Sequence, residues 1–420
     1  MPPDIIEATP AVSIPIYRLT TVPVSRPDII DASTAYRRNV LAALSSGGWA
    51  PELERSAHDA MQRLARARQI ALTPNTGRAF LAAARTIVCV AAPLLAADRL
   101  WSMGWWWAAA PLVAIAGMAL YGVVAIVHDL AHASFVRSKR VNEILGHFLA
   151  PFVLMEFGGF RRSHLDHHWH SQSTVDPKRF GVIHNERTTA PDHRTLDHSP
   201  LLLRGPARLG AWAAACLPLR VRQLGYLFIS PIFMGPAVLF FSGEFSVARR
   251  DWRRAESWVA TLMSAAFLAA LYVWSPRLLG LYLLALVIGH SFTFYVFAAH
   301  LSPNQVYWTS PRRTTVADAL NVSDIHCGTL LRWLGHGLSN YHSTHHLSPA
   351  IPCYHLPAAE RMVASDLGPF RAPAINLLEP ASCALLYDSF FRGIVLTNDE
   401  SWDYVEGGGM RRPAAPETNQ

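Results

Sequence analysis

Three histidine clusters, and their position relative to long apolar runs, most constrain what this chain can fold into. The clusters are His128-Asp-Leu-Ala-His132, His164-Leu-Asp-His167-His168 and His342-Ser-Thr-His345-His346. Residues three or four apart share one face of an α-helix, so each cluster directs two or three imidazoles towards one point. The first cluster begins where an apolar run ends. The sequence therefore predicts that helix ends bring these imidazoles together.

The number of imidazoles indicates more than one metal ion. A zinc ion takes four ligands in a tetrahedral site, so eight histidines exceed what one zinc ion uses. Two metals with higher coordination numbers suit this set better, and imidazole is a good ligand for iron. The clusters therefore predict a histidine-rich site for two metal ions.

The composition favours a polytopic membrane protein with sizeable aqueous parts. Hydrophobic residues make up 51% of the chain and charged residues only 16%. The formal charge of +7 comes from arginine, since Lys139 and Lys178 are the only lysines. We expect this basic excess to lie in cytosolic loops beside anionic lipid. No nucleic-acid-binding motif is present, and abundant alanine and proline favour a bacterial cytoplasmic membrane as the location.

Four apolar runs are long enough to cross a bilayer, which takes about 20 residues. They cover residues 79–97, 105–127, 256–274 and 278–299. The connection within each consecutive pair is short, which predicts two helical hairpins. Two other apolar segments are ambiguous. We expect residues 141–160, which contain charged side chains, to form an interfacial or re-entrant helix, and residues 226–241, with two prolines, to lie on the membrane surface.

The fold class follows from counting membrane crossings. If all three clusters share one site, the chain between His168 and His342 must cross the membrane an even number of times. Two crossings satisfy this condition and leave the basic run 249–254 in the cytosol, as the positive-inside rule requires. The sequence thus predicts an all-α integral membrane protein with four transmembrane helices in two hairpins and a cytosolic helical cap around the metal site.

Three regions follow along the chain. Residues 1–78 are expected to form a cytosolic N-terminal extension, residues 79–360 the membrane catalytic domain, and residues 361–420 a cytosolic segment with a disordered tail. Within the extension, residues 52–72 have apolar positions at helical spacing among arginines. We expect an amphipathic helix there, in solvent or on the membrane surface.

The histidine motifs and their surroundings resemble those of the membrane-bound fatty acid desaturase superfamily. The likeness covers residues 79–357. It includes the segment from His128 to Phe135, the segment from Arg161 to His168 that closes at Asp176-Pro177, and the segment from Gly337 to Pro349. These motifs and their order are specific for the superfamily, but not for a substrate or a reaction outcome.

The resemblance implies a four-span, mushroom-shaped protein with a cytosolic non-haem diiron centre and O2 as co-substrate. The implied iron ligands are His128, His132, His164, His167, His168, His342, His345 and His346. A relative with Ala-Ala-His-Leu at the end of its fourth span uses that histidine as a ninth ligand, which corresponds to His300 here. That relative has an asparagine four residues earlier, where this chain has Val296.

Four polar residues are candidates to support the histidines. Metal-bound histidines usually donate their second N–H to a carboxylate or a carbonyl. The candidates that lie close enough in sequence are Asp129, Asp166, Asp176 and Asn340. His170 leaves the helical face that the second cluster shares, and His290 lies in the middle of a span. We therefore expect neither of these histidines to bind metal.

The leading functional hypothesis is an oxygen-dependent acyl-lipid desaturase. Its substrate would be an acyl-CoA, an acyl carrier protein (ACP) ester, a free fatty acid or a phospholipid. The chain has no His-Pro-Gly-Gly segment and no cysteine cluster, so the electron donor is expected to be a separate ferredoxin or cytochrome b5. The same metal site also suits a hydroxylase, a carotenoid ketolase or hydroxylase, or a fatty acid decarboxylase. A zinc hydrolase or a metal transporter is a more distant alternative. The number of metal ions per chain distinguishes the oxygenase, with two irons, from the hydrolase, with one zinc.

Overall fold

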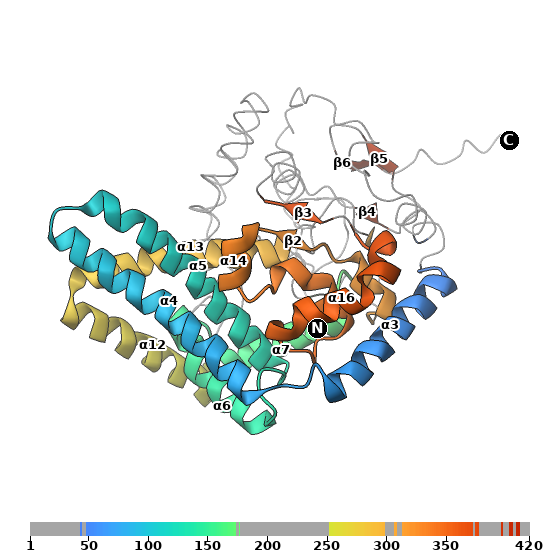
Figure 1. Ribbon diagram of the computed structural model, residues 1–420, viewed down its shortest axis with the longest axis horizontal. Coiled ribbons are helices and arrows are strands. Elements are labelled where there is room, and N and C mark those ends of the chain that lie inside the picture. Colours follow the sequence, from blue (N-terminus) through green and yellow to red (C-terminus); the bar gives the residue numbers. More distant parts are fainter. Residues whose placement is uncertain are drawn as a thin grey trace, which may run out of the picture.

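The structure is a computed structural model that describes residue 43 and residues 48–173, 176, 252–298, 306–308, 313–372, 374–377, 396–397, 403–405 and 409–411. Within these ranges the chain is mostly helical, and its strands form three small two-stranded sheets, in which residues 306–307 pair with 396–397, 325–326 with 375–376 and 403–405 with 409–411 (Figure 1). The predicted surface segment 226–241 and His300 lie outside the described residues.

The α-helices are α3 (Pro51–Ile70), α4 (Thr76–Ser102), α5 (Trp106–Ala131), α6 (Lys139–Leu149), α7 (Phe157–His170), α12 (Ala255–Trp274), α13 (Pro276–Ala298), α14 (Gly328–Leu334), α15 (His342–Leu347) and α16 (Leu356–Leu367). Short 3-10 turns are η1 (Ala150–Val153), η4 (Val316–Asn321), η5 (Ser339–Tyr341), η6 (Cys353–His355) and η7 (Gly368–Phe370). The strands are β1 (Val306–Tyr307), β2 (Ile325–His326), β3 (Ile375–Asn376), β4 (Leu396–Thr397), β5 (Asp403–Val405) and β6 (Gly409–Arg411).

Four of the described helices are long and apolar enough to span a membrane, namely α4, α5, α12 and α13. The prediction of about four such helices is confirmed, with ends that differ by a few residues. Large apolar side chains on these helices face outwards, among them Phe80, Leu262 and Trp274. Exposed apolar side chains of this size are costly in water but not in lipid, so these surfaces fit a bilayer.

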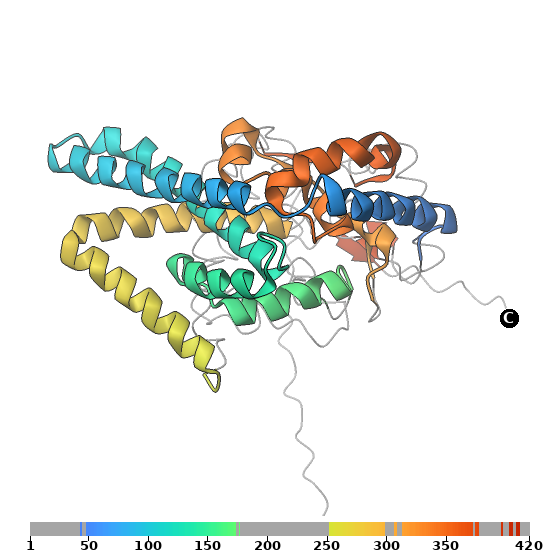
Figure 2. The ribbon, with the colours of Figure 1, turned by 60° about the horizontal axis from the view of Figure 1, so that its bottom comes forward.

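Helix α5 is the centre of the helical bundle, where it packs against both α4 and α13. A side chain at Gly117 of α5 would collide with Ile288, and one at Gly289 would collide with the backbone carbonyl of Gly117, so these glycines allow the two helices to approach closely. At the far end of the bundle, Arg277 Nε donates to Asp98 Oδ1 at 2.7 Å. This contact joins the α4–α5 and α12–α13 pairs. From this end of the bundle, α12 and α13 separate in the shape of a V (Figure 2).

The segment predicted as one interfacial or re-entrant helix, residues 141–160, contains a break. Turn η1 follows α6 directly and ends at Val153. Its C-cap residue Leu154 has a φ of 58°, in the left-handed region, and α7 begins three residues after Leu154. Glu156 caps α7, since its side chain accepts from Gly159 N–H at 3.0 Å. The two helical parts meet at 104°. The new cap and the left-handed residue are what turn the chain.

Helix α3 covers the predicted amphipathic segment, but its apolar face packs on protein. Leu53, Ala57, Ala60 and Leu64 are buried, and α3 contacts η4 and α16. The expectation of a helix that lies free in solvent or on the membrane is therefore wrong for this face. Helix α16 also runs through residue 360, so the domain boundary predicted there is wrong.

Candidate metal centre

Helix α5 carries the first histidine cluster at its end. His128 lies in the last turn and His132 is the C-cap residue, so the two side chains lie on one face one turn apart. Their ring centroids are 5.0 Å apart. The apolar helix thus places two imidazoles at the point where the candidate membrane span ends.

Helix α7 and the short helix α15 supply the other two clusters. His164, His167 and His168 follow one side of α7, and the ring of His164 stacks on Phe160 with 5.2 Å between centroids. His342, His345 and His346 belong to α15, which lies between η5 and the loop that leads to η6. All three clusters converge although the second and third are separated by more than 170 residues.

Five histidines form the tightest part of this cluster. The ligand atoms of His128, His132, His164, His168 and His345 all lie within 4.8 Å of one another. His132 Nε2 and His164 Nε2 are 2.8 Å apart, and His168 Nε2 lies 3.2 Å from His345 Nε2. The other three predicted histidines adjoin this group. His346 has its ring centroid 4.2 Å from that of His168, 5.3 Å from His167 and 4.8 Å from His342.

The protonation of these imidazoles suits metal binding. Burial lowers the pKa of His168 and of His345 well below the ordinary value, and the neighbouring imidazoles lower it further. Both rings are therefore neutral at pH 7 and keep a lone pair for a cation. His345 Nδ1 is buried and has no hydrogen-bond partner among the described residues. An all-imidazole donor set of this kind fits iron.

One carboxylate lies directly beside the cluster. His167 Nδ1 is 2.8 Å from Asp176 Oδ1, and both side chains are buried. Asp129 is more distant, since its Oδ1 lies 3.4 Å from His128 Nδ1. The other oxygen of Asp129 accepts from Cys353 N–H at 2.6 Å. Asp129 thus connects the end of α5 to the loop after the third cluster.

A match to a known protein family identifies the class of protein that carries this histidine cluster. The sequence model of the fatty acid desaturase family matches residues 104–376, which is more than half of the chain. The chain belongs to this family. It is therefore an oxidoreductase and a membrane protein.

Individual relatives of this desaturase family member agree with the assignment at low identity. It is 24% identical over 297 residues to an endoplasmic-reticulum acyl-lipid omega-3 desaturase (cytochrome b5) of Arabidopsis thaliana, with 68% of this chain and 70% of the plant protein covered. It is 27% identical over 259 residues to a fatty acid desaturase of Bacillus subtilis (59% and 66% covered). It is 25% identical over 261 residues to an sn-1 oleoyl-lipid 12-desaturase of Synechocystis (60% and 68% covered). The matches span about two thirds of each relative.

Two predicted supporting residues of this desaturase family member have neighbours other than the cluster histidines. Asp166 is largely exposed, and its Oδ1 is 3.8 Å from His170 Nε2 rather than beside a cluster histidine. Asn340 is buried, and its Oδ1 lies 3.6 Å from Cys327 Sγ. His290, expected not to bind metal, has its Nε2 3.1 Å from the backbone carbonyl of Val153.

A second group of polar residues, which no sequence pattern indicated, supports α15. Asp324 accepts from the backbone N–H and the hydroxyl of Ser343, at 2.8 and 3.1 Å. Burial raises the pKa of Asp324 to about 6, although the nearby Arg371 lowers it. Arg371 donates to both oxygens of Glu360, which in turn accepts from Thr344. No local motif marks these residues, since they come from three separate segments.

Proposed function

We propose that this protein is an oxygen-dependent desaturase of acyl lipids with two iron ions held by the eight histidines of the three clusters. The observation that carries the proposal is the convergence of five imidazoles within 4.8 Å, with three more against them. The substrate is an acyl chain carried by CoA, by acyl carrier protein, by a phospholipid or as a free fatty acid. Membership of the fatty acid desaturase family supports this class of substrate.

The reaction balances with an external source of electrons. One CH2–CH2 unit loses two hydrogens and becomes CH=CH, while one O2, two electrons and two protons are converted with those hydrogens into two water molecules. Bound iron would supply the oxidising power that removal of hydrogen from an unactivated methylene requires. A separate ferredoxin or cytochrome b5 supplies the electrons.

The chain's own residues hold and shield the histidines. Asp176 orients the ring of His167, and Asp129 connects the end of α5 to the loop at Cys353. Asp324 and Glu360 hold α15 through Ser343 and Thr344. Because His128, His164 and His345 are buried, the protein limits the access of water to the cluster. Such supporting contacts set the geometry on which the outcome of oxidation depends.

The membrane arrangement belongs to the same proposal. Helices α4 with α5 and α12 with α13 form two membrane hairpins, and the histidine cluster lies in a cap on the cytosolic side. The catalytic domain starts at residue 79 and continues past residue 360 to the end of α16 at Leu367, between a cytosolic N-terminal extension and a C-terminal segment. The contact of Arg277 with Asp98 supports this arrangement, since it brings both short connections to the same end. His300 serves as a ninth ligand at the end of the fourth span.

The test is lipid analysis of a host that expresses the protein, beside a His167→Ala variant and a His58→Ala control. His58 is exposed on α3, where its Nε2 lies 2.8 Å from Gln62 Nε2. It is far in sequence from the three clusters. We expect new double bonds with the wild type and with His58→Ala, and none with His167→Ala. Hydroxylated, ketolated or shortened products would assign the same site to a hydroxylase, a ketolase or a decarboxylase. One zinc ion per chain without any lipid product would contradict the proposal.

A further inference from the structure

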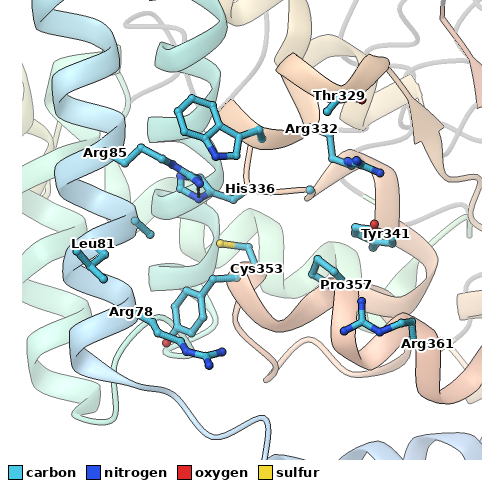
Figure 3. Close-up of a pocket in the computed structure, with 14 residues that line it drawn as sticks. Arg78, Leu81, Arg85, Thr329, Arg332, His336, Tyr341, Cys353, Pro357 and Arg361 are labelled. Carbon is cyan, nitrogen blue, oxygen red and sulfur yellow. Dashed lines mark hydrogen bonds between the residues drawn. The ribbon is translucent and has the colours of Figure 1, made fainter.

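A cavity with four arginines lies between α4 and the segments around the third histidine cluster. Its volume is about 680 Å³, and its walls come from the start of α4, from α14 and from the residues between η5 and α16 (Figure 3). Arg78 and Arg85 line it from α4, Arg332 from α14 and Arg361 from α16. No aspartate or glutamate is among the residues that line it.

The four cations have no carboxylate partner within the described part of the chain. Arg78 Nη1 lies 3.3 Å from His355 Nδ1, and Arg85 Nη2 lies 2.5 Å from His336 Nδ1. Arg332 and Arg361 are exposed side chains of this cavity. Cations that converge without a counter-charge repel one another, so the cavity favours an anion.

The guanidinium of Arg85 is held in place by a neighbour that does not compensate its charge. Thr86 Oγ1 donates to Ala82 O at 2.9 Å, so it accepts from His336 Nε2–H at 2.8 Å. His336 Nδ1 then carries the lone pair and accepts from Arg85. This neutral ring orients the guanidinium but does not compensate its charge. Arg85 Nε is buried and has no hydrogen-bond partner in the described residues, so no protein acceptor compensates the guanidinium there either.

The apolar surroundings of the cavity indicate that the anion belongs to a lipid. Leu81 lines it from α4, one of the candidate membrane spans, and is largely exposed. Trp333 of α14 lines the cavity as well, with Arg85 Cζ 4.6 Å from the centroid of its ring, and it is about half exposed. Arginine and tryptophan beside lipid-facing side chains are typical of the membrane interface. A concave site of this size suits a headgroup better than the broad surface of an acidic protein.

We propose that this arginine cavity binds the phosphate group of an anionic phospholipid headgroup at the membrane interface. The planar guanidinium donates two parallel hydrogen bonds to phosphate oxygens, so several arginines can share one phosphate. The acyl chains of the lipid then lie against the exposed apolar side of α4. The inference goes beyond the proposed reaction, because it concerns binding and does not require turnover.

The test is native mass spectrometry of the full chain in detergent, titrated with phosphatidylglycerol. The variant Arg332→Gln/Arg361→Gln removes two exposed cations of the cavity. The control Arg66→Gln/Arg68→Gln removes the same charge from exposed positions on α3, outside the cavity. We expect the cavity variant to bind phosphatidylglycerol about 10- to 100-fold more weakly, since each charge-assisted contact is worth about tenfold. The control should bind as the wild type does.

Three results would overturn the inference. Equal binding by both double variants would mean that the lipid only coats the apolar surface. Full displacement of the lipid by an equal concentration of inorganic phosphate would mean that the site takes a free anion. If the cavity variant binds the lipid normally but no longer binds an acidic electron carrier, the cavity is a docking site for that protein. The single variant Arg361→Gln, with an unchanged unfolding temperature, serves as the second measurement if the double variant is unstable.

Discussion

His167 Nδ1 donates to Asp176 Oδ1 at 2.8 Å, and Gln172 N–H donates to the other oxygen of the same carboxylate at 2.7 Å. An ionised carboxylate only accepts hydrogen bonds, so this contact fixes the imidazole tautomer with the proton on Nδ1. Nε2 then carries the lone pair, which is the form in which an imidazole binds a metal ion. Asp176 therefore acts as a positioning residue for a predicted ligand.

Asp176→Asn should weaken metal binding about 10- to 100-fold, the usual effect of losing such a partner. The amide is neutral, and its NH2 group cannot accept from Gln172 N–H. The measurement is the iron content per chain after dialysis against increasing concentrations of a chelator. Asp366→Asn is the control, because Asp366 lies on the surface and pairs with Arg63 at 2.6 Å. Equal iron retention in both variants would exclude the positioning role.

His168→Ala and His170→Ala should differ sharply although the two residues lie on the same helix. His168 belongs to the five-histidine group, whereas His170 points to Asp166 at 3.8 Å and leaves the cluster. We expect His168→Ala to lose nearly all turnover and His170→Ala to retain most of it. Both should insert into the membrane as the wild type does, because the apolar helices do not depend on either ring. Comparable turnover in the two variants would argue against a metal site at this cluster.

The spacing of histidines allowed much of the candidate site to be predicted. Positions three and four apart on a helix specify a shared face, and this rule needs no knowledge of the tertiary structure. The apolar runs likewise predict long helices, since their length matches a bilayer. His128 and His132 at the end of α5 combine both signals, which is why this part of the site was the simplest to place.

Apart from Asp176, which is close to His167 in sequence, the supporting contacts could not be predicted, because they join segments that are distant in the sequence. Asp324 reaches Ser343 across 19 residues, and Asp129 reaches Cys353 across 224 residues. Asp166 is the opposite case, a residue close in sequence. Its position between His164 and His167 suggested a supporting role, but on the helix its side chain points away towards solvent. The buried face of α3 was missed for the same reason, since its partners η4 and α16 come from the C-terminal half.

Gly122→Ala should destabilise the protein by about 1 to 3 kcal/mol through overpacking. A methyl group there would collide with the backbone carbonyl of Leu334 at the end of α14, and backbone cannot move aside as a side chain does. Gly280→Ala is the matched control on α13, since its new methyl group would meet nothing within 4 Å. Thermal unfolding in detergent should show a lower midpoint for Gly122→Ala only. A midpoint equal to that of Gly280→Ala would mean that α14 shifts without cost.

The acid stability of the protein should depend on His336. Burial and the charge of Arg85 lower the pKa of His336 from 6.5 to about 3. The unfolded chain takes up a proton below pH 6.5, whereas the folded protein does not until the pH nears 3. The free energy of unfolding therefore falls as the pH drops below 6.5, by about 1.4 kcal/mol per pH unit from this residue. His336→Gln keeps an acceptor for Arg85 and a donor for Thr86 but has no such proton to bind. Chemical unfolding in detergent between about pH 7 and pH 5 should show a shallower loss of stability for the variant, and parallel pH profiles would mean that His336 is not held neutral by the fold.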